Sequence, residues 1–103
     1  MREPRTGYSG SAELWVDGTM WRQNVVVDLT GYVEVVRVKT SEAVTYMEGV
    51  TWWDGYVKGL TWSEHIRLVG KLLELRLASG AVCRGILTGD GDGYLSGYGV
   101  SPF

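Results

Sequence analysis

The chain has 103 residues, of which 45% are hydrophobic and 21% charged, and this length fits one domain with a thin core. Ten Lys and Arg against twelve Asp and Glu leave a net charge of -2. Nucleic acid and acidic membranes attract basic proteins, so we predict neither as a partner. The 15 glycines, five tryptophans and six tyrosines indicate a turn-rich and aromatic-rich domain.

The chain has few of the side chains that bind metal ions or react as thiols. A single cysteine, Cys83, and a single histidine, His65, exclude an internal disulfide and metal sites built from Cys or His. We predict no cofactor and no metal. The N-terminal segment Met1–Arg5 lacks the apolar stretch of a signal peptide, and every hydrophobic run is too short to span a bilayer. We therefore expect a soluble cytoplasmic protein.

The first half of the chain predicts β-strands. Residues 1–6 are expected to be a disordered tail, and residues 8–29 a hairpin around Asp17-Gly18, which suits a two-residue type I′ turn. In the simplest register Tyr8 lies beside Val27 and shares an inner face with Gln23. An amide on that face needs hydrogen-bond partners, so Gln23 indicates either a polar site or a slipped register.

Glycine divides the next segment. We expect Gly31 to permit a reversal into a strand at Tyr32–Lys39. Residues Ala43–Glu48 and Val50–Lys58 are then expected to form a strand that is bent or broken at Gly49. Trp52 and Trp53 are adjacent and must point to opposite faces. The residues that alternate with them favour Trp53 as the inner one and leave Trp52 as the alternative.

The second half predicts one helix and three strands. Thr61 and Glu64 have capping-box spacing, which predicts a short helix over Trp62–Leu68. Alternating leucines predict a strand at residues 73–77 and a hairpin through Gly80 in which Leu75 faces Cys83. A last strand is expected at Tyr94–Val100. The prediction is thus an all-β fold, a single small antiparallel barrel of about seven or eight strands over residues 1–103, with one short helix.

Several possible functional motifs lack the residue spacing or the neighbouring residues that their chemistry requires. The run Gly89–Gly93 is neither a phosphate loop nor a calcium loop, because it lacks the Lys-Ser/Thr of the former, and Ser101 occupies the position where the latter requires a glutamate. We interpret it as a hairpin loop. We expect His65 to face solvent on the helix and Cys83 to be a buried apolar residue.

The aromatic residues exceed what a plain core requires. They can fill the barrel, or they can wall a pocket for an apolar small molecule, with a few polar groups fixing its pose. On the pocket hypothesis, the candidate catalytic residues are Gln23, Glu34 and Tyr32. The candidate substrate-binding residues are Tyr8, Leu14, Trp21, Tyr46, Trp52, Trp53, Leu75, Tyr94 and Tyr98.

Short motifs across most of the chain resemble a family. The sequences at Tyr8–Gly10, Val16–Gly18 and Leu29–Gly31, followed by Glu34, Trp52-Trp53 and Gly97–Phe103, are similar to a small uncharacterised bacterial domain that occurs alone or C-terminal to flavin-dependent monooxygenases. Members of that domain carry histidine where this chain has Tyr32 and the segment Thr51–Trp53. The resemblance implies no flavin or nicotinamide site, because those sites belong to the fused partner.

At the level of fold, the predicted barrel is also similar to small barrels that cyclise polyketides without a cofactor. Enclosing a flexible chain near its reactive conformation can supply several kcal/mol of catalysis, up to about 7–11. The first hypothesis is therefore a cofactor-independent cyclase or isomerase of an apolar, polyketide-like molecule. The alternatives are a non-catalytic binding or accessory module of a monooxygenase, and a solid-core structural or dimerisation domain. A homodimer is compatible with each.

Overall fold

The computed structural model describes residues 2–89 and 91–103, and in this part of the chain the fold is all-β with one short helix. The strands form a single antiparallel sheet. The fold class predicted from the sequence is thus confirmed at this level. The elements are β1 (Arg2–Val16), β2 (Thr19–Lys39), β3 (Val44–Lys58), α1 (Trp62–Leu68), β4 (Leu72–Leu77), β5 (Val82–Leu87) and β6 (Tyr94–Gly97).

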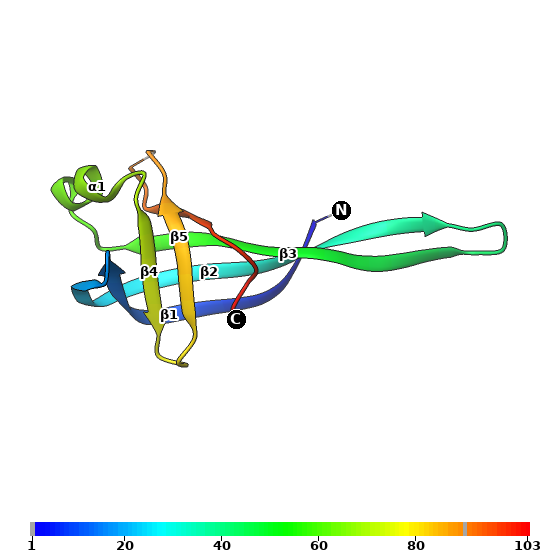
Figure 1. Ribbon diagram of the computed structural model, residues 1–103, viewed down its shortest axis with the longest axis horizontal. Coiled ribbons are helices and arrows are strands. Elements are labelled where there is room, and N and C mark those ends of the chain that lie inside the picture. The colour runs from blue at the N-terminus through cyan, green and yellow to red at the C-terminus, as the bar shows by residue number, and fades with distance from the viewer. Residues whose placement is uncertain (1, 90) are drawn as a thin grey trace.

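The sheet closes on itself. Its strand order is β1-β2-β3-β6-β5-β4, and β4 pairs back onto β1 from Ala12 opposite Leu77 to Val16 opposite Leu73. We call this closed part the ring. The shorter strands β4 and β5 cross over the long strands at one end of the molecule, and α1 lies beyond them (Figure 1).

The residues described form six strands, so the predicted count of seven or eight is wrong. The main reason is Gly31, which we expected to reverse the chain but which lies inside β2, opposite Thr6 and Trp53. A Cβ on Gly31 would collide with the Thr6 side chain and lie 2.6 Å from the Ser101 hydroxyl oxygen. This glycine therefore permits a close approach of side chains instead of a turn.

Strand β3 likewise runs through Gly49 without a break. The ladder shifts there, because Val33 pairs with Thr51 whereas Val35 pairs with Glu48. One extra residue on β3 makes this a β-bulge, which bends the strand. Of the two outcomes expected at Gly49, the bent strand is the correct one.

The hairpin at Asp17-Gly18 is confirmed, since both residues have the positive φ angles (51° and 76°) of a type I′ turn. The predicted register holds only beside the turn, where Val16 faces Thr19. Shifts between Ala12 and Trp15 then move the pairing, so that Tyr8 faces Leu29 instead of Val27. As a result, Gln23 lies on the exposed side of the sheet. The bulge thus avoids the free-energy cost of burying the Gln23 amide without hydrogen-bond partners.

The local predictions for the second half are confirmed. Helix α1 spans the predicted residues, and Thr61 and Glu64 form the reciprocal capping box. Leu75 faces Cys83, and Cys83 is fully buried. His65 is also buried, so its expected exposure is wrong; the short helix packs one face, which carries His65 and Leu68, against the rest of the domain.

The N-terminal segment is part of the sheet. Within the residues expected to form a disordered tail, Arg2 is the first residue of β1 and pairs with Glu34 of β2, and Pro4 pairs with Tyr32. Met1 and Asp90 lie outside the described residues. No helix among the residues described is long and apolar enough to cross a membrane.

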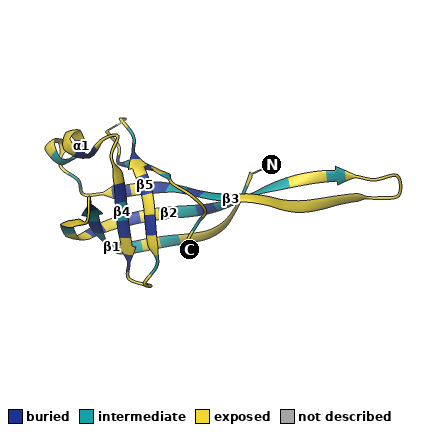
Figure 2. Ribbon diagram, in the orientation of Figure 1, coloured by how far each residue is buried: buried dark blue, intermediate teal, exposed yellow. Residues whose placement is uncertain are grey.

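Strands β2 and β3 continue far beyond the ring as a two-stranded extension (Figure 1), and the molecule is 57 Å long against 28 and 20 Å in its other dimensions. We call residues 35–50 the ribbon. Its strands pair from Val35 opposite Glu48 to Lys39 opposite Val44. Figure 2 shows burial confined to the ring, whereas the ribbon is mostly exposed.

Candidate interaction surface

Three of the predicted substrate-binding residues belong to the core. Leu14, Trp53 and Leu75 are at most 1% exposed and belong to one cluster of buried apolar side chains. The inner position favoured for Trp53 is confirmed. Within the ring these side chains pack against the leucines and valines of the other strands and form its core.

Trp53 is held closely. Its indole contacts the edge of the Phe103 ring, with centroids 5.9 Å apart. Gly85 and Gly97 leave room for it, because a Cβ on Gly97 would lie 2.6 Å from indole Cδ2 and one on Gly85 3.1 Å from Cη2. Among the described side chains, the indole Nε1 of Trp53 is the one fully buried polar atom without a hydrogen-bond partner.

Tyr8 and Trp21, also predicted to bind substrate, tie elements together at the edge of the core. The Tyr8 hydroxyl donates to the Ser11 carbonyl oxygen at 2.6 Å and accepts the Ala78 N–H at 3.2 Å. The Trp21 Nε1 donates to Glu64 Oε2 at 3.0 Å. The Tyr8 contacts link β1 to the end of β4, and the Trp21 contact links β2 to α1.

The carboxylate of Glu64 accepts hydrogen bonds from several donors. It accepts the Thr61 backbone N–H at 3.0 Å, the Trp21 indole at 3.0 Å and the Arg22 guanidinium at 2.8 Å. The Thr61 bond, and after it the Trp21 and Arg22 bonds, lower the pKa of Glu64 from 4.5 to about 2, against the opposing effect of burial.

We expect Glu64→Gln to reduce the free energy of unfolding at pH 7 by about 1–2 kcal/mol, the usual contribution of a helix cap. Because the folded pKa lies below the ordinary value of 4.5, this stabilisation is complete above pH 4.5 and is lost as the pH falls towards 2. Urea unfolding at pH 7 and pH 3 checks this, with Glu42→Gln on the exposed 40–43 loop as control. If Glu64→Gln lowered the free energy of unfolding by the same amount at pH 7 and at pH 3, the role of the charge would be contradicted.

Tyr32, Trp52 and Tyr94 come together on the outer face of the ring. Tyr32 and Trp52 stack with centroids 6.1 Å apart, and the Arg2 guanidinium lies 4.2 Å from the Tyr32 centroid. The Tyr94 hydroxyl donates to Asp54 Oδ2 at 2.6 Å. We call these five residues the outer cluster. Three of its members are predicted from the sequence as site residues, Tyr32 as a candidate catalytic residue and Trp52 and Tyr94 as candidate substrate-binding residues.

The electrostatics of the outer cluster favour a neutral phenol. The hydrogen bond to the Asp54 carboxylate, with some burial, raises the pKa of Tyr94 to about 12. Arg2 lies 3.6 Å from the same carboxylate oxygen and so balances its charge. At neutral pH Tyr94 is therefore a hydrogen-bond donor committed to Asp54 and is poorly suited to act as a base.

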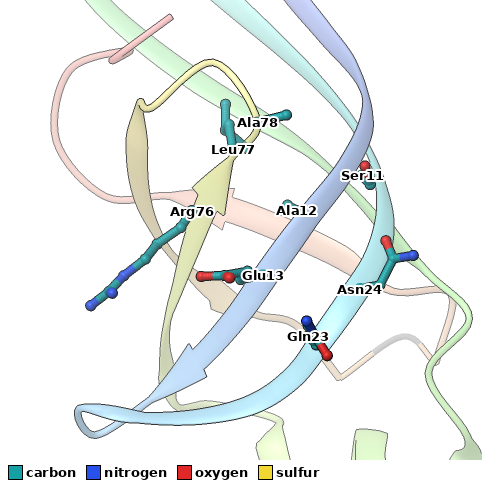
Figure 3. A pocket seen from close by; sticks show the side chains of 8 residues that line it. All are labelled: Ser11, Ala12, Glu13, Gln23, Asn24, Arg76, Leu77 and Ala78. Atoms are coloured by element: carbon teal, nitrogen blue, oxygen red, sulfur yellow. The ribbon is translucent and has the colours of Figure 1, made fainter.

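The three candidate catalytic residues do not meet. Gln23 lies near the start of β2 in a shallow groove with Asn24, Glu13 and Arg76 (Figure 3). Glu34 lies eleven residues further along the same strand, which is about 35 Å of extended chain. Tyr32 belongs to the outer cluster at that distant end. One small substrate cannot contact all three.

The ribbon carries five large exposed apolar residues, of which the pocket hypothesis included only Tyr46. Tyr46, a predicted substrate-binding residue, is 64% exposed. The others could be recognised in the sequence as apolar, but alternation along a strand does not show where the ring ends. Tyr98 is also exposed, beyond β6 and away from the ribbon. The exposed apolar residues of the ribbon are Val36, Val44, Tyr46, Met47 and Val50.

Side chains for metal or thiol chemistry are not gathered in the part of the chain described here. No group of three His, Cys, Asp or Glu residues there could hold a metal ion. Burial raises the pKa of the Cys83 thiol to about 11, and His65 stacks on Trp62 with centroids 5.5 Å apart. The reading of Gly89–Gly93 as a loop includes Asp90, which lies outside the described residues.

Comparison of the sequence and the structure with family models, curated proteins and solved structures found no match.

Proposed function

We propose that this protein is an association domain, in which the ring is a small packed barrel that serves as a scaffold and the ribbon is the element that joins chains. The observation that carries this proposal is the exposure of the ribbon. Every residue from Ser41 to Val50 is exposed, although the segment is rich in valine, tyrosine and methionine. Exposed apolar side chains concentrated in one segment are a feature of interaction sites.

The low stability expected of an isolated two-stranded ribbon supports the proposal. Two strands alone are at best marginally stable in water, because they bury little apolar surface and leave their outer edges unpaired. Val36 faces Met47 and Val38 faces Thr45 across the ladder, and directly opposed residues share one face. That face therefore carries no charge, and a partner laid on the ribbon would stabilise it.

A ribbon-shortened variant tests the proposal. Residues 37–46 are replaced by Asn-Gly, which forms a two-residue turn and keeps Val36 paired with Met47. We expect this variant to unfold as cooperatively as the full chain and to remain monomeric in light scattering coupled to size exclusion, at concentrations where the full chain associates. Association of both forms to the same extent would overturn the proposal.

The second candidate is the binding or cyclisation of an apolar small molecule, without a cofactor. The observation in its favour is the unpartnered indole N–H of Trp53 inside the ring, which suits a ligand carbonyl oxygen. Native mass spectrometry of the purified chain tests it. A co-purified small molecule that is lost in Trp53→Phe would support this candidate, and a chain of bare polypeptide mass would count against it.

A further inference from the structure

The two outer edges of the ribbon differ in charge. On the β2 side the edge carries Arg37 and Lys39. On the β3 side, residues 44–50 contain no lysine, arginine or proline, and Glu48 is their single charged residue. Natural sheets protect free edges with lysine, other charges and proline. By this measure the β2 edge is protected and the β3 edge is open to another strand.

The backbone of β3 is oriented for such pairing. The Thr40 N–H donates to the Ala43 carbonyl oxygen at 2.9 Å, and hydrogen-bonded pairs alternate with non-bonded pairs along an antiparallel ladder. Counting from Thr40 opposite Ala43, the N–H and C=O groups of Val44, Tyr46 and Glu48 face away from β2. They form a row of donors and acceptors along the open edge.

The ring does not cover this row. Among the described residues, β3 acquires a second neighbour only at Asp54–Tyr56, where it pairs with β6. The segment 44–50 lies entirely on the ribbon side of that pairing and is exposed along its whole length. Another extended strand can therefore align with it without displacing β6.

We propose that β3 of the ribbon pairs with β3 of a second copy of this chain, antiparallel and about a two-fold axis at Tyr46. This inference rests on the proposed association function and names its partner. Two-fold dimers are the commonest closed assemblies, and strand addition at an open edge is a recurring mode of recognition.

Charge selects the position of the axis. An axis at Thr45 would place Glu42 opposite the partner's Glu48, and an axis at Glu48 would place two copies of that carboxylate face to face. Like charges directly opposed across strands are destabilising. An axis at Tyr46 instead places Glu48 beside the partner's Val44, so that all three outward-facing residues of one strand pair with those of the other. An axis at Met47 would pair only Tyr46 with Glu48. The Tyr46 register therefore brings the uncharged centre of the strand together and uses the whole row of donors and acceptors.

The protected β2 edge makes the assembly closed. When two ribbons join through β3, the outer edges of the shared four-stranded sheet are both β2 edges, each with Arg37 and Lys39. A third ribbon would have to pair against these cations. We therefore expect the association to stop at two copies and not to continue into a filament.

A matched pair of cysteine variants in the full chain tests the pairing. Tyr46→Cys places a thiol at the axis, whereas Tyr98→Cys alters a tyrosine of almost equal exposure, 66% against 64%, outside the ribbon. The native Cys83 is fully buried and stays reduced. Under mild oxidation we expect Tyr46→Cys to become mostly disulfide-linked dimer and Tyr98→Cys to remain mostly monomer. Equal cross-linking in both, or none in Tyr46→Cys, would overturn the inference.

Light scattering of the unmodified chain separates this failure from failure of the proposed function. If Tyr46→Cys does not cross-link while the full chain is dimeric and the ribbon-shortened chain monomeric, then the β3 pairing is wrong and the association function stands. If the full chain is monomeric over a roughly fifty-fold range of concentration, both fail. A further variant, Arg37→Val with Lys39→Thr, should convert the dimer into larger assemblies, and an unchanged dimer would contradict the proposed closure.

Discussion

Replacing Gly97 with alanine is expected to lower the free energy of unfolding by about 3 kcal/mol or more. The new Cβ would lie 2.6 and 2.7 Å from Trp53 Cδ2 and Cε2 and would collide with the Trp53 backbone oxygen. Neither neighbour can yield, because the indole is fully buried and the oxygen belongs to the sheet. Overpacking of a core costs about 1–3 kcal/mol and occasionally more. Urea unfolding monitored by circular dichroism measures the loss.

Gly49→Ala is the matched control for this prediction. The nearest atom to a Cβ at Gly49 would be the Glu34 carbonyl oxygen at 3.5 Å, an ordinary contact. We expect its stability to change by less than about 1 kcal/mol. Equal effects of the two substitutions would mean that β6 does not close the ring tightly against Trp53.

Leu75→Ala is expected to destabilise the chain by about 2–5 kcal/mol, the range for removing a fully buried leucine from a packed core. Leu75 is 0% exposed and faces Cys83 across β4 and β5. The opposite change at its neighbour, Cys83→Leu, should also destabilise, by about 1–3 kcal/mol, since added carbons have no space. Chemical denaturation of both variants gives the two values.

This pair distinguishes a packed interior from a vacant one. In a packed ring, removal and addition of volume are both unfavourable. In a ring with free space beside Cys83, the larger side chain would fill that space, and Cys83→Leu would be neutral or stabilising. A stabilised Cys83→Leu variant would therefore restore the enclosed-ligand hypothesis to first place.

Features that depend on a few neighbouring residues could be predicted from the sequence. The turn at Asp17-Gly18 follows from backbone sterics, and the start of α1 follows from the hydrogen bonds of Thr61 and Glu64. The register of the β4–β5 hairpin follows from the turn at Gly80. In each case the determining contacts lie within a few residues along the chain.

Features set by distant contacts could not be predicted. A glycine that reverses the chain and one that admits a close neighbour look alike in a sequence, and the neighbours of Gly31 that distinguish them are Thr6 and Ser101. The polar Gln23 on the predicted inner face left a slipped register open as an alternative, although the bulges that shift the register could not be seen in the sequence. The burial of His65 could not be predicted either, because a helix of seven residues is too short to show a clear apolar stripe.

The candidate site was predicted only in part for a related reason. Alternation along β3 shows that the side chains of Trp52 and Trp53 point to opposite faces. The contact of Trp52 with Tyr32, and their position near Tyr94, can be predicted only when the order of the strands in the sheet is known. The length of the ribbon depends on where β6 stops pairing with β3, at Asp54. Neither quantity is encoded in the hydrophobic pattern of one strand.

Amide hydrogen exchange of the full chain at increasing protein concentration is the most direct test of the claim that the ribbon, and not the interior of the ring, is the functional element. We expect residues 44–50 to exchange fast in dilute solution and to become protected as the protein concentration rises, while β4 and β5 remain protected throughout. Fast exchange of residues 44–50 at every concentration would contradict this claim.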